Sequence, residues 1–173
     1  MLFLFGRSIS PSLSKYFSDR ASQNGHQVAF ASMGEFGDTE PFAELDFNPK
    51  NQLCVVFQSV TQAGGFNASS NYMQMLACAD DLKRFGAQAV WAMNPFAGFM
   101  RQDSLREDRK ESLLSDLSGR LMKESGFVGL STVDAHSQKA IENYELGLGR
   151  GNILNINPNQ VYYNALKLSL IHI

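Results

Sequence analysis

The chain has 173 residues, enough for one domain with a sizeable core, and its 44% hydrophobic and 18% charged residues are typical of globular proteins. Its formal net charge of −2 lacks the basic surplus of a protein that binds nucleic acid through phosphates. No apolar run approaches the ~20 residues that span a bilayer, and the N-terminus turns polar too early for a signal peptide. We therefore expect a cytoplasmic protein with no nucleic-acid or membrane partner.

The first third of the chain predicts three strands and one helix. Apolar runs at Leu2–Phe5, Gln27–Met33 and Leu53–Ser59 indicate strands. Several strand-like runs of this chain are continuously apolar, which is typical of a sheet covered on both faces. Between the first two runs, Ser10 and Pro11 predict a helix start, with a polar cap followed by proline at the first helical position.

The middle of the chain predicts two longer helices on either side of a strand at Ala89–Met93. The later helix is predicted over Arg109–Ser125, where leucines recur every four residues and Gly126 follows as a typical C-terminal residue. The earlier helix is predicted over Ser69–Phe85, and its apolar stripe indicates core packing rather than a cofactor site. The stripe consists of Tyr72, Met75, Leu76, Ala79 and Leu82.

The last third predicts strands at Gly129–Val133 and Ile153–Ile156, a short helix after His136 and another helix beginning at Pro158. Strands that alternate with helices of these lengths are typical of βαβ units. The predicted fold class is therefore α/β with a parallel sheet.

The last six residues, Leu168–Ile173, correspond to the codons CTG-TCT-CTT-ATA-CAC-ATC, a string that resembles a transposase adapter used in preparing sequencing libraries. We expect residues 1–167 to form the domain and residues 168–173 to be an adapter-derived tail. The other interpretation is a genuine apolar tail. His172 lies in this tail, so it is assigned no functional role.

Two further features suggest no chemistry. Cys54 and Cys78 lack metal-ligand spacing, and we expect both to be buried thiols rather than a disulfide. The glycine-rich run Gly147–Gly151 invites a dinucleotide-binding interpretation, and with it a nicotinamide-dependent oxidoreductase. However, it follows a helical pattern, whereas that motif requires a strand, a glycine turn and then a helix.

Two polar segments follow predicted strands: Pro95–Asp103 and Asp134-Ala135-His136. Ligands of parallel α/β sheets bind outside the carboxyl ends of the strands, so both segments should open onto one edge. Arg101 offers a permanent charge and a planar fork suited to phosphate oxygens. Gln102 can bond a ribose hydroxyl, a phosphate or an adenine edge. The alternative is a solvated turn.

His136 is a candidate metal ligand, because a neutral imidazole can coordinate a divalent cation. Mg²⁺ prefers oxygen ligands and retains waters, so one histidine is a weak magnesium signal. Asp134 could orient the imidazole ring or could cap the helix that follows. The alternative for His136 is a structural histidine held by hydrogen bonds.

The segment Glu35–Pro41 predicts a turn by its composition. The carboxylates of Asp38 and Glu40 could accept hydrogen bonds from an adenine amino group or from ribose hydroxyls. The alternative is an acidic loop with Phe36 packed into the core.

These three segments occur in the same order, and at similar spacing, as in the ribose-phosphate diphosphokinases, also called phosphoribosyl pyrophosphate synthetases. The chain resembles the N-terminal half of that family from about Phe3 to about Asn157. The resemblance implies a three-layer, phosphoribosyltransferase-like (Rossmann-like) domain, the first of two domains in the intact protein.

The resemblance also implies an ATP site. The family's F-S-D-G-E segment, which reaches a neighbouring subunit to bind adenine, is matched by Phe36, Asp38 and Glu40. Its Y-A-R-Q-D segment contacts ATP through residues matched by Arg101 and Gln102.

The family's D-L-H segment supplies a magnesium-linked histidine, matched by His136, with Asp134 in register as the group that would orient it. The sequence departs from the family after both motifs. Ser104 and Leu105 replace the usual basic residues, and Gln138–Tyr144 replaces a glycine-aromatic element.

The family activity is transfer of diphosphate from Mg-ATP to ribose 5-phosphate, which gives phosphoribosyl pyrophosphate and AMP. The resemblance implies Mg²⁺, ATP, ribose 5-phosphate and a homo-oligomer, a hexamer built from dimers. No stretch resembles the family's ribose-phosphate loop or catalytic loop, so we expect no catalytic residue in this chain and no turnover by it alone. The alternative is a non-catalytic regulatory homologue, a synthetase-associated binding protein, which the departures favour.

Overall fold

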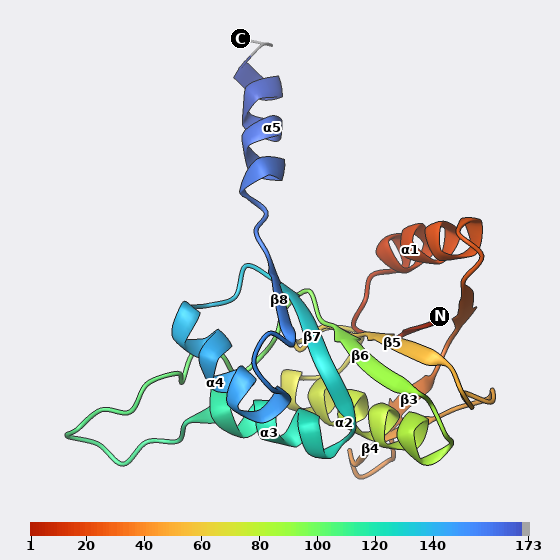
Figure 1. The fold of residues 1–173 in the computed structure, drawn as a ribbon, viewed down its shortest axis with the longest axis horizontal. Coiled ribbons are helices and arrows are strands. Elements are labelled where there is room, and N and C mark those ends of the chain that lie inside the picture. Colours follow the sequence, from red (N-terminus) through yellow and green to blue (C-terminus); the bar gives the residue numbers. More distant parts are fainter. Residues whose placement is uncertain (171–173) are drawn as a thin grey trace.

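The computed structural model describes residues 1–170. Its main sheet has six strands in the order β2-β1-β5-β6-β7-β8, and every neighbouring pair runs parallel (Figure 1). A separate antiparallel hairpin consists of β3 (Ser32–Glu35) and β4 (Pro41–Glu44). The strands of the main sheet are β1 (Leu2–Phe5), β2 (Gln27–Ala29), β5 (Leu53–Phe57), β6 (Ala89–Met93), β7 (Phe127–Val133) and β8 (Ile153–Ile156).

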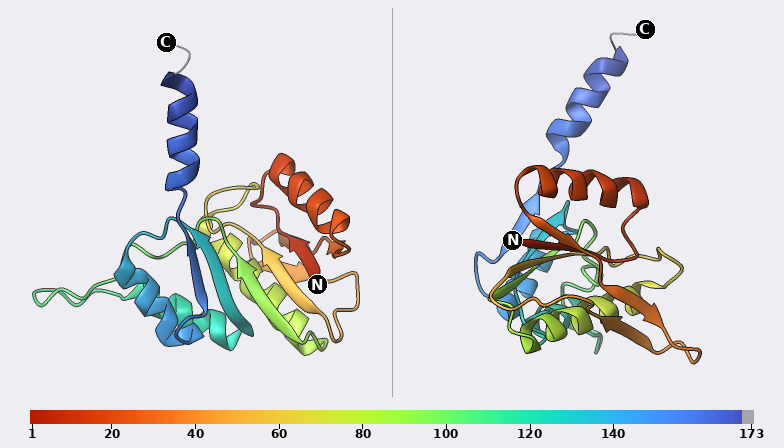
Figure 2. Two further views of the ribbon diagram at one scale, coloured as in Figure 1. Left: turned by 45° about the horizontal axis from the view of Figure 1, so that its top comes forward. Right: turned by 90° about the vertical axis from the view of Figure 1, so that its right-hand side faces the viewer.

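Helices cover both faces of this sheet, as Figure 2 shows, so the expected three-layer α/β arrangement is confirmed. On one face, Phe17 of α1 packs against Phe57 of β5. The other face is covered by α2, α3 and α4, and α5 projects away from the body (Figure 1). The helices are α1 (Pro11–Gln23), α2 (Ala68–Arg84), α3 (Leu114–Glu124), α4 (Gln138–Leu148) and α5 (Asn159–Leu170).

A row of apolar side chains crosses the centre of the sheet beneath α2. Leu4 pairs with Val56, Val56 with Ala92, and Ala92 with Leu130 on the next strand. All four are 0% exposed. Full burial of a valine or leucine side chain stabilises a fold by about 1.5–3 kcal/mol, so this row fixes the register of the central strands. The predicted stripe of α2 packs on the same side and is buried throughout.

The predicted strand over Gln27–Met33 is wrong in one respect, because the structure divides it into two strands. β2 ends at Ala29 and pairs with β1, whereas β3 begins at Ser32 and leaves the main sheet to pair with β4. Met33 is only 2% exposed. One apolar run therefore serves two sheets, and its composition alone cannot show the break.

The helix predicted over Arg109–Ser125 begins later, at Leu114. The charged stretch before it extends from the body as a loop (Figure 1). The spaced leucines lie on the exposed side, where Leu117 is 38% and Leu121 41% exposed. The buried side carries small residues, because α3 and α4 approach backbone to backbone. A Cβ added at Gly147 would lie 2.2 Å from the Gly119 carbonyl carbon.

The helices expected after His136 and from Pro158 are present as α4 and α5. Gly149 is the C-cap of α4, so the glycine run ends a helix rather than opening one. The predicted tail boundary at residue 168 falls within α5, and residues 171–173, including His172, lie outside the described residues. Across residues 1–170, no helix combines the length and the apolar character needed to cross a membrane.

The two cysteines are free and buried, as expected. Burial raises the pKa of the Cys54 thiol to about 11 and that of Cys78 to about 12, so both are neutral at physiological pH. The single tryptophan, Trp91, lies on β6, where its Nε1 donates a hydrogen bond to Ser131 Oγ at 2.9 Å. The ring lies over Gly129, where an added Cβ would come within 2.1 Å of it.

Candidate functional site

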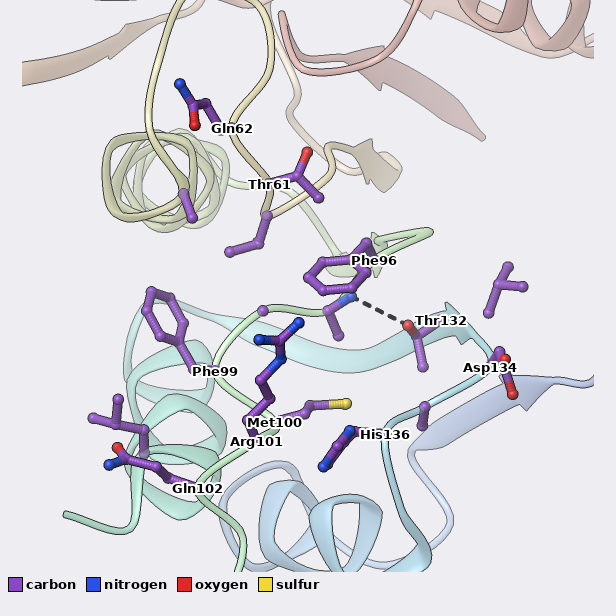
Figure 3. Close-up of a pocket in the computed structure, with 17 residues that line it drawn as sticks. Thr61, Gln62, Phe96, Phe99, Met100, Arg101, Gln102, Thr132, Asp134 and His136 are labelled. Carbon is purple, nitrogen blue, oxygen red and sulfur yellow. Dashed lines mark hydrogen bonds between the residues drawn. The ribbon is translucent and has the colours of Figure 1, made fainter. Parts of the chain in front are cut away.

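A cavity of about 800 Å³ opens at the carboxyl ends of β5, β6 and β7. Three loops form its walls, each directly following one of these strands, as expected for ligand sites of parallel sheets. Figure 3 shows its polar side chains arranged around the opening. They include Thr61 and Gln62 after β5, Arg101 and Gln102 after β6, and Asp134 and His136 after β7.

Four predicted site residues meet at this cavity. Arg101 and Gln102 come from one motif, and Asp134 and His136 from the other, about thirty positions later in the chain. All four side chains are exposed, and Figure 3 shows Arg101 and His136 on the same side of the opening. Among the described residues, neither Arg101 nor His136 forms an ion pair. The guanidinium is therefore available to an anionic ligand.

Two residues at the cavity have left-handed backbone conformations. Phe99 has φ 61° and Asp134 has φ 51°. For residues other than glycine this conformation costs roughly 1–2 kcal/mol, and such strain clusters at functional sites. Surrounding contacts hold both in place: the Phe99 ring packs edge-on against Tyr72 at 5.2 Å, and the Asp134 amide donates to the Ile156 carbonyl at 3.0 Å.

A direct link joins the two motif loops. The Ser137 hydroxyl donates a hydrogen bond to Asp103 Oδ2, and this bond holds the pKa of the Asp103 carboxyl below its usual range. Ser137 is also the N-cap of α4, accepting the Ala140 amide at 3.0 Å. The alternative in which Asp134 caps this helix is therefore wrong. No hydrogen bond joins Asp134 to His136 in the described part of the chain.

The wall formed by the loop after β5 was not predicted. Buried Asn71 of α2 holds this loop by donating its amide to the carbonyls of Thr61 at 2.7 Å and Ala63 at 3.1 Å. Thr61 and Gln62 of this loop line the cavity, together with the half-exposed Phe96 ring of the predicted segment Pro95–Asp103. Their place in the sequence is the signal that could have indicated them, because each lies shortly after the end of a predicted central strand.

The other three predicted residues lie elsewhere. Phe36, Asp38 and Glu40 occupy the β3–β4 turn and do not line the cavity. Phe36 is 58% exposed and rests on the Phe42 ring at a centroid distance of 4.9 Å, so the interpretation that packs it into the core is wrong. The turn is closed by the Thr39 amide, which donates to the Phe36 carbonyl at 2.9 Å. Adenine binding by these residues across a subunit boundary stays a prediction.

A parallel α/β domain with an open cavity at the carboxyl ends of its strands belongs to the class of α/β domains that bind small-molecule ligands at that edge of the sheet. A sequence model described as the N-terminal domain of ribose phosphate pyrophosphokinase matches residues 2–126, well over half of the chain. The chain therefore belongs to the ribose phosphate pyrophosphokinase family and represents its N-terminal domain.

Individual relatives agree with this assignment. A ribose-phosphate pyrophosphokinase of Caulobacter vibrioides is 30% identical over 107 residues, which cover 62% of this chain and 33% of the relative. A second, of Hyphomonas neptunium, is 28% identical over 131 residues, covering 76% and 38%. The chain thus spans little more than a third of these relatives' length.

A solved structure shows the same fold. The phosphoribosylpyrophosphate synthetase of Mycobacterium smegmatis superposes with a TM-score of 0.76 over 95% of this chain and 51% of that protein, at 23% sequence identity.

Proposed function

We propose that this chain is the ATP-binding half of a ribose-phosphate diphosphokinase, and that its strand-end cavity takes the polyphosphate of Mg-ATP. The observation that carries the proposal is the meeting of Arg101, Gln102 and His136, from two separate motifs, at one cavity. Its volume of about 800 Å³ is in the range of small-molecule sites. Arg101 would bind phosphate oxygens through its planar fork, and Gln102 would hydrogen-bond a phosphate or the nucleoside.

In the proposed reaction, the anomeric hydroxyl oxygen of ribose 5-phosphate attacks the β-phosphorus of ATP. A new oxygen–phosphorus bond forms, the bond between the β-phosphorus and the bridging oxygen of the α-phosphate breaks, and AMP leaves with that oxygen. Such transfers depend mainly on positioning and charge neutralisation. This chain would position ATP. The binding site for ribose 5-phosphate, and the base that takes the hydroxyl proton, would lie in the part of a full-size relative that this chain does not span.

The donor set at the cavity fits a magnesium ion carried by the nucleotide. No cluster of three or more histidine, cysteine, aspartate or glutamate side chains forms within residues 1–170, so a metal held wholly by protein is not favoured. Mg²⁺ commonly binds through one or two protein ligands together with substrate phosphates and waters. His136 would supply one such ligand, Asp134 on the same loop would orient its ring, and the bound ion would offset the negative charge of the phosphates.

We further propose that the turn bearing Phe36, Asp38 and Glu40 binds the adenine of an ATP molecule held by a neighbouring subunit of an oligomer. Its exposed aromatic ring and two exposed carboxylates lie away from the chain's own cavity, which supports such a role. The protein would then act as a homo-oligomer.

The first experiment is titration of the purified chain with Mg-ATP by calorimetry, with Arg101→Ala as the variant. A charged hydrogen bond to phosphate is worth about 1.5–3 kcal/mol, so the variant should bind at least tenfold more weakly. Arg109→Ala is the matched control, because Arg109 lies in the loop beyond the cavity and pairs with Glu111 at 3.5 Å. Equal affinity of the parent and Arg101→Ala would remove Arg101 from the site.

Magnesium dependence tests His136 separately. In the His136→Ala variant, the Mg²⁺ concentration that gives half-maximal ATP binding should rise, because one protein ligand of the ion is lost. His26→Ala is the control, because His26 follows α1 in the chain and does not line the cavity. A magnesium titration that is the same in parent and variant would contradict the metal role.

The second candidate function is a non-catalytic regulatory homologue. The segment Gln138–Tyr144, which departs from the family pattern, is the observation that favours it. Release of AMP from ATP that depends on ribose 5-phosphate, measured on a protein with the full length of its relatives, separates the two. Release supports the enzyme, whereas a folded protein without release supports the regulator.

A further inference from the structure

The segment that carries Arg101 and Gln102 is anchored by hydrogen bonds from buried side chains of α3 and α4 to its backbone carbonyls. Asn143 of α4, 3% exposed, donates from Nδ2 to the Asp103 carbonyl at 2.7 Å and to Ser115 Oγ at 2.8 Å. Ser115 of α3, 0% exposed, in turn donates its hydroxyl to the Gln102 carbonyl at 2.9 Å. Two consecutive carbonyls of the site segment are therefore bound by one buried polar pair.

A second anchor acts at the start of the same segment. The Tyr144 hydroxyl, from a side chain that is 1% exposed, donates to the Gly98 carbonyl at 2.7 Å. Tyr144 is the neighbour of Asn143 on α4, so consecutive residues of one helix hold the segment at both ends. Both belong to Gln138–Tyr144, the stretch in which this chain departs from its family's pattern.

These bonds go to backbone that lies outside the helices and strands, and the Ser115 amide adds a further hydrogen bond to the Gln102 carbonyl at 3.2 Å. The Gly98–Asp103 segment lies between β6 and α3, and the charged loop that follows it extends away from the body (Figure 1). A loop of this kind loses conformational freedom only where a partner holds it. The exposed Arg101 and Gln102 side chains can face the cavity reproducibly only if the carbonyls beside them stay fixed (Figure 3).

We propose that Asn143 is a positioning residue for Arg101 and Gln102, and that it works together with Ser115. Asn143 does not line the cavity, so it acts through the backbone of the segment and makes no contact with a ligand. This inference rests on the proposed function in one respect, namely that Arg101 and Gln102 bind the nucleotide. The anchoring itself is a property of the chain and can be measured without nucleotide.

A double-mutant cycle tests the link to binding. Asn143→Ala should weaken Mg-ATP binding by about tenfold in the parent background, but by less than about threefold in the Arg101→Ala background, because contacting residues that act through one another are not additive. A purely structural role would produce equal losses in both backgrounds, and that result would overturn the proposal. Asn152→Ala is the matched control: Asn152 Nδ2 also donates to a carbonyl, that of Leu148 at 2.8 Å, at the far end of α4.

Backbone dynamics test the anchor without nucleotide. In the parent chain, the amide order parameters of Gln102 and Asp103 should be near 0.85, and in Asn143→Ala they should fall below about 0.6. Asn152→Ala should leave them unchanged, and unchanged values in Asn143→Ala would overturn the proposal. If the parent chain binds no Mg-ATP, the proposed function fails, and these order parameters still decide whether Asn143 anchors the segment.

Should Asn143→Ala fail to fold, Tyr144→Phe removes a single hydroxyl from the other anchor and leaves the buried ring in place. It should lower the order parameters around Gly98 and weaken Mg-ATP binding in the same Arg101-dependent way. A folded Tyr144→Phe variant with parental order parameters and affinity would overturn the anchoring role of this helix.

Discussion

The two regions predicted to carry function are built in different ways. The loop after β6 is tied to the rest of the molecule: the Val60 amide donates to the Phe96 carbonyl at 3.0 Å, and the Ala97 amide donates to Thr132 Oγ1 at 3.3 Å. The β3–β4 turn is tied to itself, through the Phe36 amide and the Glu40 carbonyl at 2.9 Å.

This difference follows from where each region lies in the fold. Loops at the carboxyl ends of parallel strands lie beside one another and above the helices that cover the sheet, so buried side chains can reach their backbone. The hairpin is held at its base, where Met33 is buried and Gln74 of α2 donates to the Gly34 carbonyl at 3.0 Å, but the side chains of its turn, residues 36–40, are exposed and the turn is closed by its own hydrogen bonds. The cavity therefore forms within one chain, whereas the turn residues Phe36, Asp38 and Glu40 lie outside it.

The largest predicted effect concerns the contact between α3 and α4, the two helices that hold the Gly98–Asp103 segment. Gly147→Ala should lower the free energy of unfolding by about 1–3 kcal/mol or more, because its Cβ would meet the Gly119 backbone at 2.2 Å. The gain of about 0.5–1 kcal/mol that alanine brings to a helix is too small to compensate. Urea unfolding measures the difference.

Gly37→Ala at the hairpin turn is the matched control. A Cβ there would meet no atom within 4 Å, and the stability should change by less than about 0.5 kcal/mol. Equal losses in the two glycine variants would contradict the distinction between an anchored and an outward-facing region.

A smaller effect is expected at the hairpin itself. Phe36→Ala removes a tilted ring contact with Phe42, and aromatic pairs contribute about 0.5–1.5 kcal/mol, so thermal unfolding should shift by a few degrees at most. Mg-ATP affinity of the dilute chain should be unchanged, since Phe36 does not line its cavity. Weaker binding at a concentration where the chain is monomeric would place the hairpin at the chain's own site.

The smallest effect concerns the link between the two motif loops. The Ser137 hydroxyl lowers the pKa of Asp103 in the folded chain, so the bond stabilises the fold at pH values above the unfolded pKa of about 3.9 and is lost as the pH falls through the lower folded value. Asp103→Asn should therefore be less stable than the parent at pH 7, with the difference vanishing in acid. A stability difference that persists unchanged to pH 2 would contradict the assignment.

Most of the fold could be predicted because its central elements are strongly patterned. β1, β6 and β8 have the predicted bounds, and α2 ends within one residue of its prediction. The errors lie where tertiary contacts decide. The run after Gln27 is shared by two sheets, and α3 turns its small residues rather than its leucines towards α4, because a close backbone approach leaves no room for larger side chains.

The site was predictable to the extent that it follows strand ends. Arg101 and His136 could be placed at one edge because parallel strands present their carboxyl ends together. The anchors could not be predicted, because Asn143 and Ser115 lie 28 positions apart and meet through the packing of two helices. No spacing rule in the sequence indicates which loop carbonyl a buried amide will reach.

The position of Trp91 gives this chain an internal optical label. It is the only tryptophan, half-buried on β6 with its indole bound to Ser131, and it does not line the cavity. Its emission will therefore follow the opening of the central sheet and will be largely insensitive to the filling of the cavity. Tryptophan fluorescence can therefore report whether each variant is folded, while its ligand binding is measured by a separate signal.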